Sequence, residues 1–440
     1  MAVKKQAVLN EEASNMSLMD ILSQGKGSEV FKKNSLIDYS YSTGIPLIDY
    51  AIGYTICVKD DSGELIKKRL CLGIPAGSFN VVTGITQAFK TTIMVQIISN
   101  IAYANGGNVK HYDTENKSVF ERIKQLSKLP EFWFDGDHPM YSYHYGAIGF
   151  DTLQKDITAI YENKMRYRDV LLKDTGEVDA HNQPIKMMPP TVILLDSLQD
   201  VISEAIKYNI DSKDFQSTEE LRTNMAGAQT AKTTRGFITD ILPMLKEANI
   251  IFICIAHKTS NMGQGQFQPP RKQFTYASAS ERISGGTAVE FNATTVMSLT
   301  GNNSADSIYS KETDGFNGNQ TLFEPTKCST NESGNKRTGR GFILVIDRDK
   351  NGVDNYRSLL LFLKSRNRLK GNAAGFRVID DKGNEISNKF TWKKLYDDFA
   401  KDEETYKTFM HAAKEELETL VAGSDENAAG TICPLNMSAF

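Results

Sequence analysis

Seven short apolar runs, separated by helix-like segments, most constrain what this chain can fold into. They cover residues 78–84, 108–115, 191–197, 249–257, 294–300, 342–348 and 357–364. Runs of aliphatic and β-branched residues without polar alternation are typical of strands buried on both faces. Between the first two runs, TTIMVQIISNIAYANGG has a helical character and ends in a Gly-Gly stop. This alternation predicts an α/β protein with a mainly parallel, twisted sheet flanked by helices.

Composition and charge exclude several classes of protein. The 440 residues are 40% hydrophobic and 24% charged, as is usual for a soluble globular protein. No apolar run is long enough to span a bilayer, and the first fifteen residues have no signal-peptide core. The five cysteines have no metal-ligand spacing. We therefore expect an intracellular, cytoplasmic protein without a membrane partner. The net charge of −3 excludes a wholly basic nucleic-acid coat but permits a local basic channel.

The core is expected to carry appendages at both ends. Residues 1–40 are polar, with apolar Leu18, Met19, Ile21 and Leu22 at helical spacing, which predicts an arm that packs on a neighbouring subunit. Residues 41–387 form the predicted core, and residues 388–440 form a small helical C-terminal region. Polar insertions interrupt the core at 59–68, at 172–184 and at about 301–340. The third is rich in Asn, Ser, Thr and Gly, which predicts surface loops or partial disorder.

A phosphate-binding loop follows the first apolar run. The segment GITQAFKT, residues 84–91, fits the spacing G-x-x-x-x-G-K-[ST], except that Phe89 replaces the second glycine. In such a loop successive backbone N–H groups meet phosphate oxygens at a helix N-terminus. Lys90 would reach the β- and γ-phosphates, and the Thr91 hydroxyl would bind Mg²⁺. The expected ATP-binding residues are Gly84, Ile85, Thr86, Gln87, Ala88, Phe89, Lys90, Thr91 and Thr92.

Two carboxylates follow neighbouring apolar runs. Asp196 ends TVILLD, so it would emerge at the carboxyl edge of the sheet and bind Mg²⁺ together with Thr91. Glu115 ends NVKHYDTE, where a carboxylate near the γ-phosphate can orient and activate water. Asp113 is the alternative base in the same run.

These segments together resemble a known family. The loop variant GxxxxFK[ST] resembles the UvsX-type recombinases of tailed phages, a branch of the RecA family. STGIPLIDYAIG, HYDTEN, VILLDSL, QTAKTTRGFITDILPMLKEANIIFICIAH and ISGGTAVEFNATTV are similar to RecA segments in order and spacing. The resemblance covers roughly Ser42 to Ile379, and it favours Glu115 over Asp113 as the base.

The resemblance implies a RecA-like core and a DNA-dependent ATPase that needs Mg²⁺. Such a protein forms helical filaments of itself on single-stranded DNA and pairs it with homologous double-stranded DNA in recombination, repair or recombination-dependent replication. Loader and single-strand-binding proteins stay open as further partners. The resemblance also makes His257 a sensor of the γ-phosphate, and Lys364 and Arg366, in LLLFLKSRNRLKG, cations that enter a neighbour's ATP site.

Single-stranded DNA would bind the long segment after His257. The segment combines cations with aromatic residues, which suits phosphates and unstacked bases. The expected DNA-binding residues are Lys258, Phe267, Arg271, Lys272, Phe274, Tyr276 and Arg282. Lys207, Lys213 and Arg222 are weaker candidates for a first DNA loop.

Two other functions fit parts of the pattern. A ring-forming DNA helicase with the same core fold would also carry the phosphate-binding loop, but it usually has a helical N-terminal domain. A scaffold that binds ATP only for assembly would not need Lys90, Thr91, Glu115 and Asp196 together.

Overall fold

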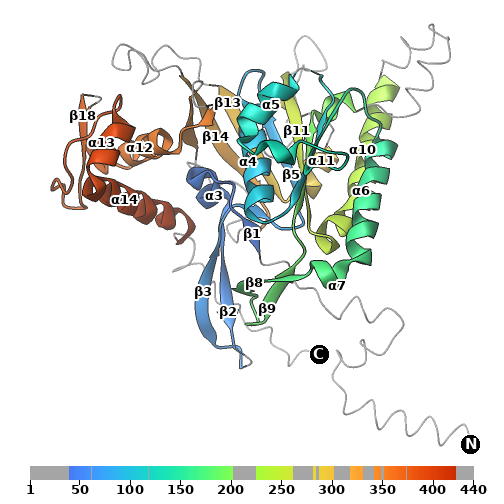
Figure 1. Cartoon of the computed structure of the whole chain (residues 1–440), viewed down its shortest axis with the longest axis horizontal. Helices are drawn as coiled ribbons and strands as arrows, with labels where there is room; N and C mark the ends of the chain where they lie inside the picture. The colour runs from blue at the N-terminus through green and yellow to red at the C-terminus, as the bar shows by residue number, and fades with distance from the viewer. Residues whose placement is uncertain are drawn as a thin grey trace, which may run out of the picture. The chain divides into compact units, whose positions relative to one another are not determined.

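A ten-stranded mixed sheet forms the centre of the protein (Figure 1). The computed structural model describes residues 39–60, 62–116, 118–201, 224–260, 281–283, 287–301, 318–330, 341–347, 351–372 and 374–422. Nine strands follow the order β16-β15-β14-β13-β5-β11-β10-β6-β7, and β12 pairs with β11. In that order the strands are β16 (Gly352–Val353), β15 (Phe342–Asp347), β14 (Gly318–Cys328), β13 (Thr295–Gly301), β5 (Phe79–Gly84), β11 (Ile250–Ser260), β10 (Thr191–Asp196), β6 (Asn108–Asp113) and β7 (Tyr141–Tyr145), and β12 is Glu281–Ile283.

The strands from β13 to β7 are parallel to one another, whereas β14, β15, β16 and β12 pair antiparallel. Every residue of β5 and β10 is buried, because helices cover both faces of the sheet. The prediction of an α/β protein with a mainly parallel sheet is confirmed.

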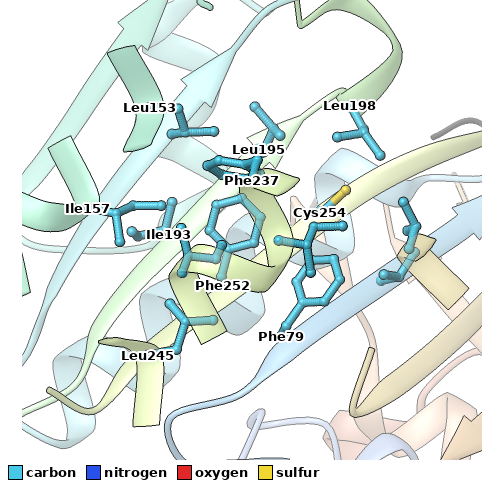
Figure 2. Packing of buried hydrophobic residues seen from close by; sticks show 14 of the residues in the cluster. Phe79, Leu153, Ile157, Ile193, Leu195, Leu198, Phe237, Leu245, Phe252 and Cys254 are labelled. Carbon is cyan, nitrogen blue, oxygen red and sulfur yellow. The ribbon is translucent and has the colours of Figure 1, made fainter. Parts of the chain in front are cut away.

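One face of the sheet packs on two long helices, α6 (Phe150–Arg166) and α10 (Asn224–Glu247). Figure 2 shows Leu153 of α6 and Phe237 of α10 against strand residues that include Phe252. The opposite face packs on α4 (Lys90–Ala104), whose Ile93, Met94 and Ile97 are fully buried. The helix predicted after the first strand is therefore confirmed.

The two shorter polar insertions form β-hairpins that lie side by side (Figure 1). One hairpin joins β2 (Tyr54–Lys59) to β3 (Leu65–Cys71), and the other joins β8 (Lys173–Val178) to β9 (Pro184–Met187). The backbone N–H of Lys59 donates to the Ala180 carbonyl at 2.9 Å, which links the two hairpins.

The prediction that residues 301–340 form surface loops is wrong for part of this segment. Residues 318–328 form β14, which lies between β13 and β15 in the sheet. Its Phe323 is fully buried. The polar composition concealed the strand because several of its buried residues, among them Gln320, Thr321 and Lys327, are themselves polar.

The prediction that the seventh apolar run, residues 357–364, forms a strand is also wrong. Residues of the run 357–364 belong to helix α12 (Asn355–Ser365), which packs on β15 and on α14 (Glu403–Ala422). Asp354 caps this helix, and its side chain accepts a hydrogen bond from the Arg357 N–H at 3.0 Å. A helix buried around its whole circumference has the same continuous apolar run as a buried strand.

The helical C-terminal region is confirmed for residues 395–422, which form α13 (Leu395–Lys401) and α14. The boundary between core and C-terminal region was expected at residue 387. Backbone hydrogen bonds between Phe376 and Phe390 join residues on the two sides of this boundary. The expected arm lies outside the described residues except for Tyr39 and Ser40. Within the described ranges, no helix combines the length and the apolar character that crossing a membrane requires.

Candidate functional site

The candidate site lies where four parallel strands end at one edge of the sheet. Gly84 ends β5 and pairs in register with His257 of β11. Asp196 ends β10 and pairs in register with Asp113, the last residue of β6. The sequence-predicted residues Gly84, Lys90, Thr91, Glu115, Asp196 and His257 therefore meet at this edge, where ligands bind in open α/β sheets.

Residues 85–89 form a loop that leads from β5 directly into α4. Lys90 is the first residue of the helix, and its side chain curls back over the loop. The Lys90 Nζ donates to the carbonyl oxygens of Ile85 at 2.7 Å and of Gly84 at 3.2 Å. Ile85, Thr86 and Gln87 are exposed, whereas Ala88 is buried. The loop thus has three exposed residues beside a helix N-terminus, an arrangement that can bind anions.

Phe89 occupies the position where the phosphate-loop pattern has glycine. It lies before the first residue of α4 with φ 60° and ψ 24°, in the left-handed region. Gln87 also has a positive φ, 66°. Bulky side chains rarely adopt this conformation, so the backbone has the shape that a glycine would favour even though the residue is phenylalanine.

Two further strands, β13 and β14, lie against the phosphate loop and its first glycine. A Cβ atom on Gly84 would lie 2.2 Å from the Leu299 carbonyl oxygen of β13, so only glycine fits. The Thr321 hydroxyl of β14 lies 3.3 Å from the Ala88 carbonyl and 3.2 Å from the Thr300 carbonyl, and its one proton is shared between these two acceptors. Sequence reasoning missed Thr321, because it lies in the segment predicted to be surface loop, and no pattern around it indicates a contact with the loop.

Thr91 and Asp196 lie next to each other. The Thr91 hydroxyl donates to Oδ2 of Asp196 at 2.5 Å. Burial raises the pKa of Asp196 to about 6, the Thr91 hydrogen bond opposes this rise, and the nearby Glu115 and Asp113 charges add to it. A buried carboxylate with acidic neighbours favours a nearby cation.

A hydroxyl and a carboxylate are the oxygen donors that Mg²⁺ accepts, usually with phosphate oxygens and water completing its six ligands. The Thr91–Asp196 pair fits that requirement. Among the described residues, no group of three or more His, Cys, Asp or Glu side chains could hold a metal ion by itself.

The structure distinguishes Asp113 from Glu115. The Asp113 carboxylate is buried and accepts from the N–H groups of Asn116 at 2.8 Å and Ser118 at 3.1 Å, and from the Tyr143 hydroxyl at 2.8 Å. Glu115 instead lies 2.6 Å from His257, between Oε1 and Nε2. Asp113 therefore stabilises the turn that follows β6. Glu115 instead contacts His257 of β11, the predicted sensor.

Only part of the predicted DNA-binding segment is described. Strand β11 continues through Ser260 and pairs with β12, so Lys258 and Arg282 lie in strands and not in a loop. The Lys258 Nζ donates to the Ser298 hydroxyl at 3.0 Å. Phe267, Arg271, Lys272, Phe274 and Tyr276 lie outside the described residues, as do Lys207, Lys213 and Arg222.

Lys364 and Arg366 lie at the C-terminal end of helix α12. We expected them at the end of an apolar strand, and that expectation is wrong because the run is helical. Both side chains are exposed. The Lys364 Nζ lies 5.8 Å from the ring centroid of Phe376, and the Arg366 Cζ lies 5.6 Å from that of Phe362. Their action on a neighbour's ATP site stays a prediction that rests on the resemblance alone.

Comparison with known proteins adds no identification. No family model matches the sequence, and a search of curated proteins finds no match.

Proposed function

We propose that this edge of the sheet binds and hydrolyses ATP with Mg²⁺. The observation that carries the proposal is the 2.5 Å contact between Thr91, in the first turn of α4, and Asp196, at the end of the adjacent β10. Phosphates would bind the backbone of residues 84–89 and the Lys90 ammonium group. Thr91 and Asp196 would hold the Mg²⁺, which neutralises charge on the β- and γ-phosphates when bound.

Glu115 is the proposed general base. A carboxylate that accepts a proton from water must be held near the γ-phosphate but must not be saturated by structural hydrogen bonds. Asp113 is committed to two backbone N–H groups and one tyrosine hydroxyl, which supports Glu115 for this role. His257 contacts Glu115 and pairs in register with Gly84, so it could transmit the state of the nucleotide to the strand β11 that leads toward the predicted DNA-binding segment.

We further propose that the chain is a RecA-type recombinase that forms filaments on single-stranded DNA and pairs it with homologous double-stranded DNA. Support comes from the resemblance in sequence and from the continuation of β11 beyond His257 into Lys258 and the strand pair with β12. A ring-forming helicase is the second candidate, because the same site would serve it.

A pair of variants tests the ATP site. Lys90→Ala should abolish measurable ATP binding, because the variant loses the cation that would meet the β- and γ-phosphates, while Lys155→Ala, exposed on α6, serves as the control. Glu115→Gln should retain ATP binding but lower kcat by roughly 10²–10⁴-fold, the usual contribution of a general base. Calorimetry and phosphate release measure both effects.

Electron microscopy of the full chain with single-stranded DNA and ATP tests the second part of the proposal. Helical filaments that persist in Glu115→Gln would support the recombinase, and closed rings would support the helicase. Undiminished ATP binding by Lys90→Ala would contradict the assignment of the phosphate loop.

A further inference from the structure

Thr114 joins the ends of the two strands that carry the proposed base and the proposed metal carboxylate. The pairing between β6 and β10 ends at Asp113 and Asp196. Beyond that pair, the Thr114 N–H donates to the Asp196 carbonyl at 2.7 Å. The Thr114 hydroxyl donates to the Ser197 carbonyl at 2.8 Å and accepts from the Ser197 N–H at 2.8 Å.

The Thr114 hydroxyl therefore replaces a pair of backbone hydrogen bonds between the two strands. It satisfies both the donor and the acceptor of a single residue just beyond β10, a reciprocal pattern that backbone groups make in antiparallel pairs and not in the parallel pairing of β6 and β10. Because a side chain makes the connection, the backbone of β6 is free to turn away at this point. That turn directs the next residue, Glu115, toward His257.

A second clamp holds the other side of the turn. Asp113 accepts from the Asn116 and Ser118 N–H groups. The Tyr143 hydroxyl lies 2.8 Å from the Asp113 carboxylate and 3.0 Å from the Ser118 carbonyl, so its one proton is shared between these two acceptors. Glu115 lies between these clamps. The charges of Asp113, Glu115 and Asp196 repel one another, so the turn needs such connections to keep three carboxylates close together.

We infer that Thr114 is a positioning residue, whose hydroxyl sets the place of Glu115 relative to Asp196. The inference rests on the proposed ATPase function. A displacement of about 1 Å at a reacting group can cost roughly 100-fold in rate. Thr114→Val keeps the shape but loses both hydroxyl hydrogen bonds, and we expect kcat to fall by at least about tenfold with the KM for ATP changed by less than about twofold. Thr114→Ser keeps the hydroxyl and should restore most of kcat.

The same pair of strands offers a matched control. Thr191, at the opposite end of β10, donates from its hydroxyl to the Asn108 side chain of β6 at 2.8 Å. Thr191→Val removes a buried hydroxyl between the same two strands, far from the site. We expect it to lower stability without changing kcat.

Hydrogen exchange measured without nucleotide tests the positioning independently of any activity. Thr114→Val should speed exchange of the amides of residues 114–116 and 118 by at least about tenfold, whereas Thr191→Val should leave them unchanged. Unchanged exchange in Thr114→Val would overturn the inference even in an active enzyme. Faster exchange with normal kcat, or equal losses of kcat in both valine variants, would overturn the catalytic part. A wild-type chain that does not hydrolyse ATP would refute the proposed function, while the exchange result would still decide whether Thr114 holds the turn.

Discussion

Single residues of the phosphate loop show how far a sequence pattern specifies conformation. Phe89 stands where glycine is usual, and its backbone nevertheless adopts the left-handed conformation with φ 60°. That conformation costs a non-glycine residue about 1–2 kcal/mol. Contacts of its half-buried ring with the surrounding core are expected to offset this cost.

Phe89→Gly and Phe89→Ala separate the two contributions. Both variants lose the ring, but only glycine also removes the backbone strain. We therefore expect Phe89→Gly to be more stable than Phe89→Ala by about 1 kcal/mol, with ATP affinity close to that of the wild type. Urea unfolding measures the difference. Equal stabilities of the two variants would show that the left-handed conformation carries no cost here.

The choice between Asp113 and Glu115 is also made at the scale of residues. The two carboxylates are two positions apart in one run, so sequence alone leaves both open. The hydrogen bonds to Asn116, Ser118 and Tyr143 assign Asp113 to the support of the turn. Tyr143 belongs to β7, which is distant in sequence, and a pattern within the run could not indicate this contact.

Six of the seven apolar runs were predicted correctly as strands, whereas the run in α12 and the polar strand β14 were not. β14 was missed because it lies in a polar segment and because buried residues such as Gln320, Thr321 and Lys327 are themselves polar. In the sheet, however, its neighbours β13 and β15 cover both of its edges. Phe323 and Thr321 are fully buried, so the strand contributes to the core as well as to the phosphate loop.

Truncation of one β14 side chain tests its place in the core. Phe323→Ala should lower the free energy of unfolding by about 3–5 kcal/mol, as for other buried phenylalanines. Glu324→Ala, at the adjacent exposed position, should change it by less than about 0.5 kcal/mol. Chemical denaturation of both variants gives the comparison. If both variants changed the free energy of unfolding by a similar small amount, residues 318–328 would form a surface loop, as the sequence predicted.

Two buried carboxylates make the stability of the whole molecule depend on pH. Burial raises the pKa of Asp49 to about 6, although hydrogen bonds from Ser42 and Thr43 oppose the rise. Burial likewise raises the pKa of Asp196 to about 6. The folded state therefore keeps two protons that the unfolded state releases near pH 4.

The stabilisation from these protons is fully present below about pH 4 and is lost as the pH rises to about 6. As the pH rises across this window, deprotonation of each carboxylate should lower the free energy of unfolding by up to about 1.4 kcal/mol per pH unit. Asp196→Asn cannot titrate, so the stability of the wild type relative to this variant should fall between pH 4 and pH 6 and level off above it.

Urea unfolding at several pH values measures this difference, with the exposed Asp135→Asn as the control. A difference between wild type and Asp196→Asn that does not change with pH would show that Asp196 is not protonated in the folded state.

The sequence by itself determined the class of the fold and most of the candidate site. Long apolar runs identified six strands of the sheet, and parallel strands present their carboxyl ends at one edge, so Gly84, Asp196, Glu115 and His257 were expected together. These inferences depend on local patterns. The periodicity of apolar residues identifies a strand, and the direction of the strand determines at which edge of the sheet its last residue lies.

Only the tertiary structure decided which residues support that site. Thr114, Thr321 and Tyr143 act through hydrogen bonds to partners far away in the chain, and such contacts leave no periodic signal in the sequence. The structure likewise made a helix of residues 355–365, because an apolar run buried on all sides fits either element. Local sequence determines what a segment can become, and packing against distant segments determines which possibility is realised.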